Sequence, residues 1–147
     1  MKKSTPLFIF ILLIMTSCSN AGVVELQEEN TFKAPQAFIV TDFREYAGSA
    51  PFAIENITLS KNLLSINIKY SGGCNEHLFQ LVGHKMVSKS EPPQRSVHLF
   101  HNNNGDSCRE IIQDILVFDI SALAYENRET TLDIEGFDKK IKYTPIN

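Results

Sequence analysis

From Phe32 onward, short apolar runs alternate with clusters of glycine, proline, asparagine and aspartate. The clearest run is 64–70, where Leu, Ile, Ile and Tyr alternate with Ser, Asn and Lys. Alternation with a period of two places every second side chain on the same face of a strand, so one face is buried. The glycines of Ser71-Gly72-Gly73 then permit a turn or a close backbone approach. No comparable stretch has a convincing helical period, so we expect an all-β domain.

About seven short antiparallel strands are expected, packed as a small β-sandwich or barrel. Residues 111–120 would also suit a helix, but their β-branched residues favour a strand, and 121–128 contains one helical turn. Asn104-Gly105 is a hairpin signal, because both residues tolerate positive φ. The chain has ten phenylalanines and no tryptophan, which argues against the immunoglobulin core and predicts a core filled by phenylalanine. The expected strands are 54–59, 64–70, 77–86, 96–101, 111–120, 130–134 and 140–144.

The N-terminus has the pattern of an export signal. Lys2 and Lys3 precede an apolar run of nine residues, 7–15. A membrane-spanning helix needs about 20 apolar residues, so this run is expected to be a cleaved leader. Met15-Thr16-Ser17-Cys18 resembles the lipobox of bacterial lipoproteins. That resemblance implies a diacylglyceryl group on the Cys18 thiol, cleavage before Cys18 and acylation of the new amine.

Three segments are therefore expected: a lipoprotein signal peptide (1–17), a lipidated flexible tether (18–31) and a single β domain (32–147). In the sorting rule of diderm bacteria, Ser19 in place of aspartate directs a lipoprotein to the outer membrane. Cleavage leaves 12 basic against 17 acidic residues, a net charge of −5. This charge disfavours nucleic acid. The expected partners are the membrane, held through the lipid, and an envelope protein.

The cysteine count is odd, and the lipid accounts for Cys18. Cys74 and Cys108 are then expected to form a disulfide in an oxidising compartment. One alternative is a tetrahedral zinc or copper site made by these two thiolates with His77 and His101. Two free thiols are the other alternative.

A disulfide would bring the loops 71–77 and 101–108 together. Glu76, His77, His101 and Asp106 would then converge at one end of the domain. They could bind zinc or copper beside the disulfide, since imidazole and carboxylate suffice as ligands. The structural interpretation is that the asparagines and Asp106 bond their own turns and that the histidines are surface or satisfied core residues.

The phrase Gly-Gly-Cys-x-x-His at 72–77, followed by His-Asn-Asn-Asn-Gly-Asp-x-Cys at 101–108, resembles small uncharacterised envelope lipoproteins. The resemblance covers about half of the mature chain and implies a shared fold and the same cysteine pairing, but no activity. No Gly-x-Ser-x-Gly, His-Glu-x-x-His or phosphate-binding glycine loop is present. We therefore expect a non-catalytic binding or structural module rather than an enzyme, with a metal-binding lipoprotein as the alternative.

Overall fold

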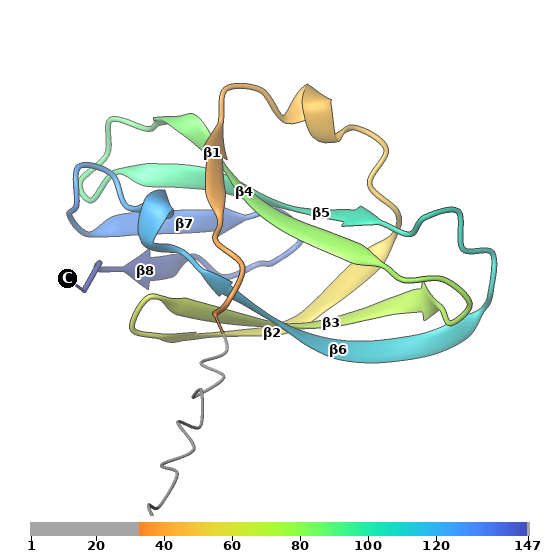
Figure 1. Ribbon diagram of the computed structural model, residues 1–147. Coiled ribbons are helices and arrows are strands. Elements are labelled where there is room, and N and C mark those ends of the chain that lie inside the picture. The colour runs from red at the N-terminus through yellow and green to blue at the C-terminus, as the bar shows by residue number, and fades with distance from the viewer. Residues whose placement is uncertain (1–32, 147) are drawn as a thin grey trace, which may run out of the picture. The chain divides into compact units, whose positions relative to one another are not determined.

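The computed structural model describes residues 33–146, which form two β-sheets packed face to face (Figure 1). The five-stranded sheet has the order β1 (Phe38–Val40), β4 (Leu78–Val87), β5 (Gln94–Asn102), β7 (Thr130–Ile134), β8 (Ile141–Tyr143). The three-stranded sheet has the order β2 (Phe52–Ser60), β3 (Leu63–Gly72), β6 (Glu110–Asp119). Two short 3-10 helices, η1 (Phe43–Tyr46) and η2 (Ser121–Leu123), complete the elements. The predicted all-β sandwich is confirmed.

The signal peptide, the lipidation of Cys18 and the tether lie outside the described residues, so these remain predictions. Within 33–146, no helix is long and apolar enough to cross a membrane.

Two strand pairs are parallel, so the expectation of antiparallel strands throughout is wrong. β1 runs parallel to β4, and β5 runs parallel to β7. Between β5 and β7 the chain crosses to the other sheet to form β6, and it returns in the same direction. Only a short hairpin connection requires antiparallel pairing, and neither of these pairs has one.

The Asn104-Gly105 turn forms as predicted, with φ of 48° and 70°. However, the strands on its two sides do not form a hairpin. β5 belongs to the five-stranded sheet and β6 to the three-stranded sheet, so the turn lies in a loop between sheets. Asn104-Gly105 specifies the backbone conformation of the turn, whereas tertiary packing decides which sheet the next strand joins.

Branched aliphatic side chains fill the core, contrary to the phenylalanine core that we expected. Leu64, Ile66 and Ile68 point inward from β3 and are fully buried. Among the described residues, Phe118 is the one phenylalanine with a buried side chain, while Phe52, Phe79 and Phe137 pack partly buried around the core. Most inward positions on the facing strands hold compact side chains, while Tyr143 and Phe118 are the aromatic rings buried in the core among the described residues.

Residues 111–120 form a strand and not a helix. β6 pairs with β3 without a register shift, from Leu63 opposite Asp119 to Gly72 opposite Glu110. This register directs Phe118 into the core and Ile111 and Ile115 to solvent. Apolar side chains of 111–120 therefore lie on both faces of the strand. This lack of strict alternation explains why the sequence of this run suits a helix as well as a strand.

Candidate functional site

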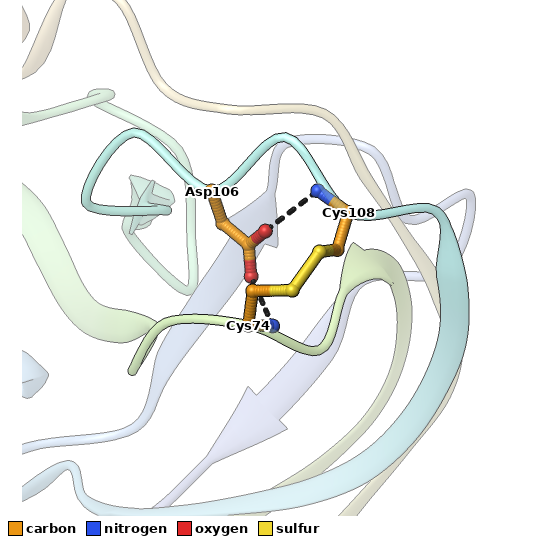
Figure 2. A group of neighbouring side chains, drawn as sticks. All are labelled: Cys74, Asp106 and Cys108. Carbon is orange, nitrogen blue, oxygen red and sulfur yellow. Dashed lines mark hydrogen bonds between the residues drawn. A yellow bond between two sulfur atoms is a disulfide. The ribbon is translucent and has the colours of Figure 1, made fainter.

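The loops between β3 and β4 and between β5 and β6 meet at one end of the sandwich. Cys74 in the first loop is bonded to Cys108 in the second, and their Cα atoms are 5.9 Å apart (Figure 2). The loop pairing that the sequence predicts is therefore present.

Asp106 holds these two loops through its carboxylate (Figure 2). One oxygen, Oδ2, accepts the backbone N–H groups of Cys74 at 2.8 Å and Asn75 at 2.9 Å. The other, Oδ1, accepts the N–H of Cys108 at 2.7 Å. The N–H donors, led by Asn75, hold the pKa of Asp106 far below its usual range. The side chain is 0% exposed, so this carboxylate is an internal structural group.

A chain of hydrogen bonds runs from Asp106 into the protein through two histidines. His77 Nε2 lies 3.2 Å from Asp106 Oδ2, and His77 Nδ1 lies 2.7 Å from His101 Nε2. His101 Nδ1 then bonds the carbonyl of Ala50 at 3.2 Å. The His77 side chain is 2% exposed and His101 is 1% exposed. His101 also stacks on Phe79, with centroids 4.3 Å apart and 9° between planes.

The outer nitrogens of the two rings both face acceptors: His101 Nδ1 faces the Ala50 carbonyl, and His77 Nε2 faces the Asp106 carboxylate. The inner nitrogens, His77 Nδ1 and His101 Nε2, face each other. Burial lowers the pKa of His101. Each of the four ring nitrogens therefore lies within hydrogen-bond distance of a partner.

This arrangement leaves no ready set of metal ligands in the cluster. The tetrahedral site with Cys74 and Cys108 is incompatible with the disulfide, because both sulfurs are bonded to each other. Donor atoms of these two cysteines and Asp106 lie within 4.8 Å of one another, but the carboxylate already accepts three N–H groups. The structure brings His77, His101 and Asp106 together as predicted. Glu76 is exposed and does not join them.

The loop before β2 completes the site, and sequence reasoning missed it. His101 N donates to Ser49 Oγ at 3.0 Å, and Ala50 N donates to the His101 carbonyl at 2.8 Å. These residues lie about fifty positions from His101 in the chain, and nothing in their types signals the contact. Only the folded sheets bring this loop to the histidine.

Arg95 is a second buried polar residue that the sequence does not signal. The residue is 4% exposed, and its guanidinium donates to the carbonyls of Leu123 at 2.7 Å and of His84. Desolvation lowers its pKa, and the carbonyls compensate for part of that cost. His84 and His98 both contact the Phe43 ring, in agreement with a surface or packing role.

An apolar groove lies beside the buried cluster, between β4 and β6. It consists of two adjoining hollows of about 390 and 250 Å³ that share Pro35, Leu78, Phe79 and Phe118. Leu78 is 50% exposed at its margin, and Ile115 of β6 is 61% exposed. The end of the sandwich thus combines a closed polar network with an open apolar surface.

Residues 36–146 match the family model of the NigD-like C-terminal beta sandwich domain. The chain belongs to this NigD-like family. The match includes every strand of both sheets and both loops of the disulfide.

Two solved structures with a similar fold come from Bacteroides species. A NigD-like immunity protein from Bacteroides caccae is 18% identical with a TM-score of 0.57, covering 77% of this chain and 64% of that one. A protein of unknown function from Bacteroides vulgatus is 17% identical with a TM-score of 0.52, covering 78% of this chain and 58% of that one. The NigD-like chain described here therefore spans less than two thirds of each. A sequence comparison with curated proteins returns no match.

Proposed function

We propose that this NigD-like chain is a lipid-anchored, non-catalytic envelope protein that binds another protein. The observation that carries the proposal is the contrast between the two features at one end of the sandwich. The polar side chains His77, His101 and Asp106 are buried and fully bonded to one another and to backbone. The neighbouring groove is apolar and exposed, a combination that favours protein contact over chemistry on a small substrate.

The proposed partner is a protein toxin. One solved chain of the same fold is described as a NigD-like immunity protein, and the toxin against which immunity is directed is the partner that we propose. The identity of 18% supports only the fold, so the toxin is the hypothesis under test.

The proposed location is the outer membrane, with the anchor on Cys18. This rests on the lipobox resemblance of 15–18, on Ser19 after the cysteine and on the acidic charge of the remaining chain. Two or three acyl chains hold a protein on a bilayer stably, whereas one gives marginal binding. The anchor would concentrate the domain at the surface where an incoming toxin arrives.

The test is photo-cross-linking of the full-length chain in its native membrane. A photoreactive residue is placed singly at exposed positions, including Ile115 on β6 and Lys139 in the loop between β7 and β8, and adducts are identified by mass spectrometry. We expect one recurrent protein adduct that is confined to neighbouring positions. No adduct from any position would overturn the proposed binding function.

A further inference from the structure

β6 is an edge strand with a free side. It pairs with β3 on one side, and among residues 33–146 no strand pairs with the other side (Figure 1). At its C-terminal end, Asp119 N donates to the Pro35 carbonyl and the Asp119 carbonyl accepts from Ala37 N. Strand edges with unpaired N–H and C=O groups are sites at which another strand can be added.

The free side presents the backbone groups of alternate residues. Because Asp119 directs its N–H and C=O away from β3, Val117, Ile115, Gln113 and Ile111 do the same in the regular register. Pro35 ends the contact with the preceding chain, since it has no N–H for the Val117 carbonyl. Within residues 33–146, no strand occupies the edge from 111 to 117, although the Ile115 N–H there is already bonded to the neighbouring Asp114 side chain.

The groove beside this edge has mainly apolar walls and one carboxylate. Leu78, Phe79, Leu116 and Phe118 line it, and Asp114 is the one carboxylate among the described residues that line either hollow. Polar side chains, among them Gln36, Tyr70 and His77, complete the walls, and none of the described lining residues is a lysine or arginine. Asp114 also shields the edge, because its Oδ1 accepts the Ile115 N–H at 2.7 Å. A basic side chain near Asp114 would find a carboxylate with no lysine or arginine among the described residues that line the groove.

A second copy of the chain is a poor occupant of this edge. β6 contains Glu110, Asp114 and Asp119 and no basic residue. Antiparallel pairing of two copies would bring carboxylates together without a cation, and like charges on facing strands are destabilising. Charge complementarity therefore favours a different chain.

We infer that the free edge of β6 binds an extended segment of the partner protein as an added strand. The segment carries apolar residues that contact Leu78 and Phe79 and a lysine or arginine that pairs with Asp114. The inference rests on the proposed binding function and specifies its surface and the chemistry of its ligand. Backbone hydrogen bonds provide affinity in this mode, and the alternate side chains provide selectivity.

The direct test uses a synthetic octapeptide of alternating threonine and valine with one central lysine, with both ends blocked. It is added to the full-length protein in detergent, and amide hydrogen exchange is followed by NMR. We expect slower exchange at Ile111, Gln113 and Val117, whose N–H groups face the free edge. The intervening Ile112 and Leu116, bonded to β3, should change little. Uniform or absent protection would overturn the inference.

The charge pairing is tested by Asp114→Lys. The wild-type protein should bind the lysine peptide about threefold more tightly than the same peptide with glutamate, and Asp114→Lys should reverse this order. Asp138→Lys is the matched control, because it makes the same charge change in the exposed loop between β7 and β8. An equal effect of both variants would show that net charge alone is responsible and would contradict the pairing.

Cross-linking separates this inference from the proposed function. Two proteins labelled at position 115 are compared, one with Asp114 and one carrying Asp114→Lys. A protein adduct that forms in the first and is lost in the second agrees with the binding function and with the β6 site. A protein adduct from Lys139 but not from Ile115 would overturn the β6 site and retain the binding function. No adduct from either position or from any other would overturn both.

Discussion

Gly72 lies where the His77 ring leaves no room for a side chain. A Cβ atom at this position would be 2.5 Å from His77 Nε2 and 2.6 Å from His77 Cε1. The ring cannot move away easily, because Asp106 and His101 hold both of its nitrogens. The glycine that follows the Leu64–Tyr70 alternation thus serves the packing of the histidine pair.

Gly72→Ala is therefore expected to lower the free energy of unfolding by about 1–3 kcal/mol, the usual cost of overpacking. Urea denaturation measures it. Ser96→Ala, at an exposed position of β5, is the control and should change stability by less than about 0.5 kcal/mol. Equal losses in the two variants would contradict the steric explanation.

Asp106 makes stability depend on pH in a predictable direction. Its folded-state pKa is depressed by the N–H donors of Asn75, Cys108 and Cys74, so folding favours the ionised form. The stabilisation is complete above the ordinary aspartate pKa of about 4 and is lost as the pH falls towards the lower folded-state value.

Asp106→Asn should therefore be less stable than wild type at neutral pH, with the difference shrinking as the pH falls below about 4. Thermal unfolding from pH 7 to pH 2 measures this. Asp138→Asn, in an exposed loop, should follow the wild-type curve. A difference between Asp106→Asn and wild type that stays constant with pH would show that the carboxylate charge is not responsible.

At the scale of elements, the disulfide joins two loops, and each loop connects a strand of one sheet to a strand of the other. It links the β3–β4 loop to the β5–β6 loop across a separation of 34 residues. The bond therefore connects both sheets, and it encloses β4 and β5 in one covalent loop. Loss of the disulfide should mainly increase the conformational entropy of the unfolded chain, and it should change the folded sheets little.

The double variant Cys74→Ser with Cys108→Ser is expected to lose about 3–4 kcal/mol of unfolding free energy, as the loop-entropy model gives. Chemical denaturation of oxidised and reduced wild type supplies the reference. Ser107→Ala, a neighbouring exposed change, should have a small effect. If reduced wild type were as stable as oxidised wild type, the disulfide would have no stabilising role.

Strand patterns were predictable where one face is buried and the other is solvated. β3 has this alternation, and residues 64–70 are a strand as expected. β1 was missed, because three residues are too few for a period and because the strand exists only through its parallel pairing with β4. Asn104-Gly105 likewise forms its turn, but neither residue encodes which sheet receives β6.

At the scale of the whole molecule, the proposed lipid anchor on Cys18 would determine where the β-sandwich acts. Full-length Cys18→Ser should leave the membrane fraction, and it should lack the mass of the diacylglyceryl group and of the acyl chain. Fractionation and intact-mass spectrometry measure both, with Ser17→Ala as a control that keeps a small residue before the cysteine. Retention of Cys18→Ser in the membrane would contradict lipid anchoring through this residue.

The sequence by itself determined the all-β class, most strand positions and the pairing of the two loops through Cys74 and Cys108. These follow from side-chain period, turn residues and cysteine count, which are local or additive properties. Tertiary structure alone decided that His77, His101 and Asp106 form a closed hydrogen-bonded network and that Glu76 stays outside it. Burial and hydrogen-bond direction depend on neighbours far along the chain, such as Ala50, and so does the free edge of β6.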